Sequence, residues 1–394
     1  MKRTAFCSIA ILCLSCTPGE QNGPERAGEV VFSDAPFLGE EAWNIGQGPH
    51  LTIGSDGERE SGISLWRVRD ALRLDDGRIV VAQANVNPLL ILDPQGEFLR
   101  GMSREGEGPA EFRGIKSINV LSDGTIAAWG TVNRHLVLFD TLGRHRKTFS
   151  YRATVPELLI SAHISTSMNL VAPKVSGPGA QPREGRRIEA PVQYLLFDTL
   201  GHRTILAEVP GYSMVGRERE GRARWGRLLF GFISQCAEHA GRVVIGTTMD
   251  YEIQEFNLVP SPLLVRRIRW RPEEDRSVTQ AHREDYLRLR ASTSDDPAFQ
   301  RSLTQLEDDD FNEVFPTHSR MRFGRDGFLW VRRYPRPGEV HGLWYVFDPA
   351  GRWATTVTLP ADLELLDAGE DFLLGKIRTD LDVEQLHLYR LHKG

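Results

Sequence analysis

Apolar strands that run into the sequence Asp-x-x-Gly recur four times along the chain. In each case a second strand-like run follows the glycine. The aspartate side chain can accept hydrogen bonds from the backbone amides ahead of it, and the glycine can adopt the positive φ that closes a tight hairpin. The pattern therefore predicts four hairpins of one kind, at Ile91–Gly96, Leu138–Gly143, Leu196–Gly201 and Val346–Gly351.

A second hairpin pattern alternates with the first. Asp-Gly pairs lie between apolar runs at residues 76–77, 123–124 and 326–327, and such pairs are strong hairpin signals. Two alternating hairpins make a four-stranded repeat, which is typical of the blades of a β-propeller. The sequence thus predicts an all-β fold, a six-bladed β-propeller. Weaker versions of the two patterns complete the series at residues 165–167, 239–241, 259–262 and 368–370.

The sixth blade lacks an outer hairpin, because the chain ends soon after the strand-like run at residues 386–391. The segment His50–Gly54 precedes the first blade and has the pattern of a short strand. We expect this N-terminal strand to complete the last blade. Such closure would remove the exposed sheet edge that otherwise invites aggregation.

Loop lengths indicate which side of the disc could bind a partner. The turns within the hairpins are short, whereas the long connections, at 103–116, 174–191, 209–227 and 271–316, all fall on the opposite face. Long loops on a rigid scaffold commonly carry binding groups, so we predict a loop-rich binding face. The last connection has helical periodicity, which predicts a two-helix insert at about 272–312, between blades 4 and 5. It could be a lid over the channel or a packing element.

The first residues have the pattern of an export signal. Lys2 and Arg3 precede an apolar run that is too short to span a bilayer, which needs about 20 residues. Leu14-Ser15-Cys16 resembles a bacterial lipobox, in which the cysteine is lipidated, although an ordinary signal peptide cut nearby remains the alternative. We therefore expect a signal peptide at 1–15, a lipidated tether at 16–38 and the propeller at 39–394. The expected location is the bacterial cell envelope, at an outer membrane and facing the periplasm or the surface.

Composition narrows the functional classes. A formal net charge of −5 lacks the basic surplus of a nucleic-acid binder. After removal of the signal and lipidation of Cys16, Cys236 is the one remaining cysteine, and its apolar neighbours predict a buried thiol. Zinc-helix, phosphate-loop and Gly-x-Ser-x-Gly motifs are lacking in the sequence. We assign no catalytic residue, no cofactor and no metal.

The segment Arg104–Phe112 reads Arg-Glu-Gly-Glu-Gly-Pro-Ala-Glu-Phe. Together with the hairpin repeats and the lipoprotein start, it resembles the six-bladed β-propeller lipoproteins of bacteria, a family of uncharacterised function. The resemblance implies the fold and an envelope location and brings no activity with it. Within this loop, Arg104, Glu107 and Glu111 are candidate ligand contacts, or they form ion pairs in a brace between blades.

A second candidate lies in the connection at 209–227. Arg222, Arg224 and Trp225 could grip carboxylates, phosphates or sugar rings through forked hydrogen bonds and ring faces. A solvated loop is the simpler interpretation of the same residues.

The patterns favour a non-enzymatic, membrane-tethered propeller that binds a protein, peptide or glycan on its loop-rich face. The alternative is a metal-dependent hydrolase or lyase similar to the propeller lactonases, whose channel metal is held by oxygen ligands on inner strands. Here Asn119, Glu157 and Glu364 are the candidates, and they do not form a convincing set. We expect no nucleic-acid partner.

Overall fold

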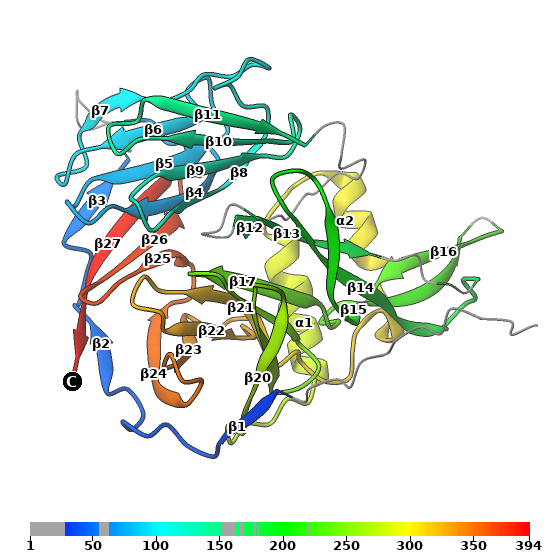
Figure 1. The fold of residues 1–394 in the computed structure, drawn as a ribbon. Coiled ribbons are helices and arrows are strands. Elements are labelled where there is room, and N and C mark those ends of the chain that lie inside the picture. The colour runs from blue at the N-terminus through cyan, green and yellow to red at the C-terminus, as the bar shows by residue number, and fades with distance from the viewer. Residues whose placement is uncertain are drawn as a thin grey trace, which may run out of the picture.

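The computed structural model describes residues 28–54, 63–151, 163–164, 169–175, 179, 181–219 and 221–394. Within these residues most of the chain is β-strand, and the strands form six sheets (Figure 1). In each sheet the strands follow one another in chain order from an inner strand outward, and the fourth and sixth sheets add N-terminal strands at the outer side. None of the helices among the described residues is long and apolar enough to cross a membrane.

The first three sheets come from the first half of the chain. The first contains β4 (Val68–Arg73), β5 (Ile79–Gln83), β6 (Leu89–Leu92) and β7 (Phe98–Gly101). The second contains β8 (Ile115–Val120), β9 (Ile126–Gly130), β10 (His135–Phe139) and β11 (His145–Ser150). The third contains β12 (His163–Ile164), β13 (Leu170–Val175), β14 (Arg187–Phe197), β15 (Arg203–Arg219) and β16 (Arg222–Arg227).

The other three sheets incorporate the N-terminal strands. The fourth contains β17 (Ser234–His239), β18 (Arg242–Thr247), β19 (Glu252–Asn257), β20 (Leu263–Trp270) and β1 (Glu29–Ser33). The fifth contains β21 (His318–Phe323), β22 (Leu329–Arg333), β23 (His341–Phe347) and β24 (Trp353–Pro360). The sixth contains β25 (Glu364–Ala368), β26 (Phe372–Arg378), β27 (Glu384–Lys393), β2 (Trp43–Ile45) and β3 (Leu51–Ile53).

The six inner strands form a closed ring. Each inner strand contacts the next one in the order β4, β8, β12, β17, β21 and β25. The ring closes because β25 contacts β4. Each neighbouring pair of sheets encloses its own apolar cluster. In the cluster between the sixth and first sheets, for example, Leu374 packs with Ile79. Burial of these side chains is the main force that holds each sheet to the next. The arrangement is that of a β-propeller.

The N-terminal strand closes the ring as predicted. β3 pairs antiparallel with β27, with Ile53 opposite Leu386 and Leu51 opposite Leu388. Ile53 is buried, and its side chain fills the space beside Gly96, where a Cβ would lie 2.6 Å from the Ile53 side chain. The two ends of the chain therefore share one sheet.

The segment before β3 departs from the prediction of a tether extending to residue 38. β1 pairs in parallel with β20, and the backbones of Phe37 and Leu38 bond to Trp353 and Ala354 on β24. β2 then pairs with β27. We call residues 29–45 the strap, because they run along the outer edges of the fourth, fifth and sixth sheets (Figure 1). The run Glu-Val-Val-Phe-Ser has the β-branched and aromatic residues that favour a strand.

The Asp-x-x-Gly turns form as predicted. In all four, the aspartate Oδ1 accepts hydrogen bonds from the amides two and four residues ahead, at 2.8–2.9 Å. The four glycines have φ between 74° and 85°, a conformation that other residues rarely adopt. The weaker turn at 259–262 joins β19 to β20. The turn predicted at 165–167 lies outside the described residues.

The connection at 209–227, predicted as a loop, is largely strand, and the one at 174–191 is strand at its two ends. β14 begins at Arg187, and β15 continues to Arg219 before β16 returns from Arg222. Alternating side chains and a Gly221 turn with φ of 70° allow this segment to fold as a hairpin. We call residues 210–219 and 221–227 the arm, which projects from the third sheet (Figure 1).

Helices α1 (Gln280–Ala291) and α2 (Pro297–Thr304) lie between β20 and β21, capped by Thr279 and Asp296. A 3₁₀ turn, η1 (Asp308–Asp310), follows them. This insert packs on an aromatic cluster that includes Phe230 and Phe315. Asp310 is buried and pairs with Arg217 of the arm at 2.8 Å. The arm and the insert therefore support each other.

Candidate functional site

The inner strands of all six sheets surround a cavity of about 320 Å³. Its lining includes Asp75, Ser122 and Arg325, which belong to the short turns that follow inner strands. The cavity thus lies toward the short-turn face, opposite the predicted binding face. None of the described residues that line it belongs to the helical insert.

Asp70 on β4 is buried in this lining and all its bonds are to the protein. Its Oδ2 accepts the Ile118 amide of the second sheet at 3.0 Å, and its Oδ1 pairs with Arg322 of the fifth sheet at 2.9 Å. Burial raises the pKa of Asp70, although the charge of Arg322 opposes the shift. A carboxylate bonded in this way joins three sheets.

Asp367 on β25 has the same kind of environment. Its Oδ2 accepts the Arg73 amide of the first sheet at 2.8 Å and lies 3.4 Å from Nε of Arg325. Burial raises the pKa of Asp367 to about 6, against the opposing charge of Arg325. Like Asp70, it connects its own sheet to two others.

Two of the candidate metal ligands can be placed. Asn119 lines the cavity, where its Nδ2 donates to Glu238 Oε2 at 3.0 Å. Glu364 pairs with Arg320 at 2.6 Å and Lys376 at 3.0 Å, and these charges hold its pKa below the usual value although burial opposes them. Glu157 lies outside the described residues. Across the described part of the chain, His, Cys, Asp and Glu form no group of three that could hold a metal ion.

The channel charges are therefore committed to bonds between sheets. Their carboxylate oxygens are occupied by backbone amides and arginines, which leaves them poorly placed to act as ligands or bases. The described residues do not fit the channel metal of the hydrolase alternative. Sequence reasoning missed Asp70, Asp367 and Arg322. For the two aspartates, the available signal was an acidic residue inside an inner strand.

The loop at 104–112 borders a surface groove of about 600 Å³ on the loop-rich side. Arg104 pairs with Glu111 at 2.5 Å, and Glu111 also accepts the Gly108 amide at 2.8 Å. These bonds, led by the Gly108 amide, lower the pKa of Glu111. Glu107 pairs instead with Arg113, at 2.7 Å.

The same loop is also fastened to the second sheet. Nδ2 of Asn133, in the turn between β9 and β10, donates to the carbonyls of Gly106 and Glu111 at 2.9 and 3.2 Å. The Arg104 side chain is 80% exposed despite its ion pair. The loop thus forms a brace between two sheets and also one wall of the groove.

The groove has both apolar and polar lining residues and adjoins an edge that no described strand pairs. Phe98 and Met102 line it, and Phe98 is 50% exposed. Among the described residues no strand pairs with the outer edge of β7, whereas the strap covers the edges of β20, β24 and β27. Phe98 was not singled out from the sequence, because the pattern does not tell an exposed edge from a covered one.

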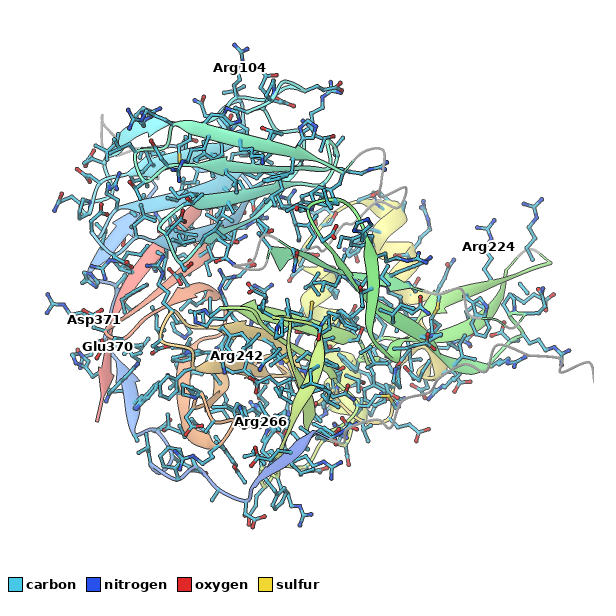
Figure 2. All side chains as sticks on the ribbon, viewed as in Figure 1. Arg104, Arg224, Arg242, Arg266, Glu370 and Asp371 are labelled. Atoms are coloured by element: carbon cyan, nitrogen blue, oxygen red, sulfur yellow. The ribbon has the colours of Figure 1, made fainter. Side chains whose placement is uncertain are left out.

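The arm separates the three residues predicted to act there. Adjacent residues of a strand point to opposite faces, so Trp225 lies on the face opposite Arg222 and Arg224. Arg224 lies opposite Arg217 in the pairing of β15 with β16. Figure 2 shows that Arg104 and Arg224 lie on different sides of the molecule. The structure therefore does not bring the two sets of predicted residues together.

The two cysteines of the prediction have different outcomes. Cys16 lies outside the described residues. Cys236 is buried as predicted, and burial raises the pKa of its thiol to about 12. A thiol in this state is unreactive.

Comparison with known proteins finds likenesses to solved structures at low sequence identity. No family model and no curated protein match the sequence. A Bacteroides fragilis protein named as exported has 11% identity and a TM-score of 0.48, with 92% of this chain and 99% of that chain covered. A DUF4221 family member from Bacteroides vulgatus has 8% identity and a TM-score of 0.47, with 89% and 99% covered. A streptogramin B lyase has 10% identity and a TM-score of 0.37, with 88% of this chain and 98% of that chain covered. Likenesses at this level carry no inference about function.

Proposed function

We propose that this chain is an exported, lipid-anchored six-bladed β-propeller that acts as a binding module, and that its ligand is an extended peptide segment. Anchoring is supported by Lys2, Arg3 and the lipobox-like Leu14-Ser15-Cys16. The blade count is supported by the six sheets and the ring of inner strands.

One observation carries the choice of ligand: the groove beside β7 places the exposed Phe98 next to an edge that no described strand pairs. A peptide that adds a strand to such an edge gains main-chain hydrogen bonds, while pockets receive its alternate side chains. Phe98 offers an exposed apolar contact in this groove, and Arg104 also lines it. The fixed Arg104–Glu111 wall means that little order is lost when a ligand binds.

Panning a random-peptide display library against the purified protein tests this proposal. We expect enriched peptides to bind the Phe98→Ser variant at least about tenfold more weakly, since an apolar anchor commonly contributes more than 1.4 kcal/mol. Methylation of alternate backbone amides in a selected peptide should abolish binding, because the main-chain bonds are lost.

Leu142→Ser provides the matched control, since Leu142 is similarly exposed on the second sheet and lies outside the groove. Peptides whose affinity is unchanged by Phe98→Ser, or that tolerate amide methylation, would assign binding to another surface and refute the proposed site.

A further inference from the structure

The strap carries a run of exposed apolar side chains. Val30, Phe32, Phe37 and Leu38 are each 46–52% exposed. Single exposed apolar residues are ordinary on protein surfaces, but four within nine residues of one segment are a patch.

The two short segments that carry these side chains are both bonded to one residue of β24. Val30 and Phe32 alternate on β1 and so share one face of it. The chain then turns at Trp353, whose amide donates to Ser33 Oγ at 3.1 Å and whose carbonyl accepts the Phe37 amide at 3.0 Å. Both ends of the turn thus meet at one residue. We call these four residues the rim patch.

Arginines surround the rim patch. The Arg271 guanidinium lies 5.5 Å from the Phe32 ring, and that of Arg352 lies 4.8 Å from the Phe37 ring. Exposed acidic residues, Asp34 among them, are also present. Charges of both signs therefore border the rim patch, and we expect apolar burial to contribute most to its binding.

The position of the patch in the chain identifies its occupant. Phe32 follows Cys16 by about sixteen residues, which span at most about 55 Å even when fully extended. An acyl group on Cys16 would hold the rim patch within this distance of the bilayer, at a high effective concentration. We infer that the rim patch inserts into the headgroup–acyl boundary of the membrane, with Arg271 and Arg352 at headgroup level. The inference rests on the proposed lipid anchor.

Vesicle binding by the unlipidated mature chain tests the inference. The chain from Thr17 onward contains every described residue and carries no lipid. We expect it to co-sediment with phosphatidylethanolamine–phosphatidylglycerol vesicles, and we expect Phe32→Ser/Phe37→Ser to reduce the partition coefficient at least about tenfold. Raising the salt from 50 to 300 mM should change binding less than about twofold, because apolar insertion is not screened.

Leu142→Ser/Leu200→Ser is the control, since it removes two exposed apolar side chains that lie outside both the strap and the groove. Equal partition of the parent and the strap variant, or loss of binding in high salt, would overturn the inference. Self-association of the parent without vesicles, abolished by the strap variant, would assign the patch to a protein contact and also overturn it. Acylation of Cys16 and peptide binding in the groove are measured separately, so failure here leaves both standing.

Discussion

Two buried ionisable side chains have shifted pKa values, and the two shifts change the free energy of unfolding in opposite directions as the pH falls. Burial lowers the pKa of His318 to about 3 from a usual value of 6.5. Its contribution to stability is therefore complete above pH 6.5 and is lost as the pH falls toward 3. Burial raises the pKa of Asp367 to about 6, so its contribution is present below its usual pKa of 3.8 and is lost as the pH rises through 6.

Replacing His318 should make the protein less sensitive to acid. Between pH 6.5 and 4.5 the parent should lose about 2 kcal/mol of unfolding free energy relative to His318→Gln, because each pKa unit corresponds to about 1.4 kcal/mol. Urea denaturation at the two pH values measures this difference. The exposed His341 gives the control variant His341→Gln. A parallel loss in the parent and His318→Gln would show that another group titrates.

At the scale of elements, the arm and the helical insert form one unit outside the ring. Arg217 bonds Asp310 on one side and Glu184 on the other, at 2.8 and 2.9 Å. Arg187 adds hydrogen bonds to the carbonyls of Asp309 and Phe311 at 3.3 and 3.2 Å. The arm of the third sheet and the insert that follows the fourth sheet are thus held together by these bonds.

Asp310→Asn should loosen this unit without opening the ring. It leaves Arg217 buried with one carboxylate fewer, which should cost about 2 kcal/mol. Hydrogen exchange should accelerate in β16 and α1 and stay unchanged in the inner strands. The neighbouring Asp309, mostly exposed and 3.9 Å from Arg187, supplies the control Asp309→Asn, expected to cost under about 0.5 kcal/mol. Acceleration throughout the protein would contradict this separation.

The contrast between turns and arm shows what the sequence can predict. An Asp-x-x-Gly turn depends on bonds within five residues, so Asp93 and Gly96 suffice to predict it. The pairing of β1 with β20, or of Arg217 with Asp310, depends on residues far apart in the chain. A local sequence pattern does not indicate which distant residue a strand or side chain will pair with. For the same reason, Arg104 and Glu111 were found as a local pair, whereas the bond of Asp70 to Arg322 was not.

At the scale of the whole molecule, stability depends on one joint between the chain ends. β3 and β27 bring Ile53, Leu386 and Leu388 into the cluster that also holds the first sheet. Without this pairing the part of the β27 edge beside Leu386 and Leu388 would be open, and β2 alone would pair with that edge of β27.

A disulfide across the joint should form and stabilise the protein. Thr52 and His387 are paired residues of β3 and β27, so Thr52→Cys/His387→Cys should oxidise within one chain. The gain in unfolding free energy should be about 2–4 kcal/mol, as expected for a long closed loop. Gel mobility and reductant-dependent denaturation measure both effects. Thr52→Cys/Thr148→Cys is the unpaired control, and a bond that forms only between chains would place β3 elsewhere.

The strap and β3 also set the order of events during biosynthesis. The strap and β3 precede all the inner strands in the chain, but they bond to β20, β24 and β27, which lie in its later part. A nascent chain that does not yet include β27 therefore lacks the strand with which β3 pairs. Contacts of such large sequence separation form slowly. The ring can therefore be sealed only after β27 has been synthesised.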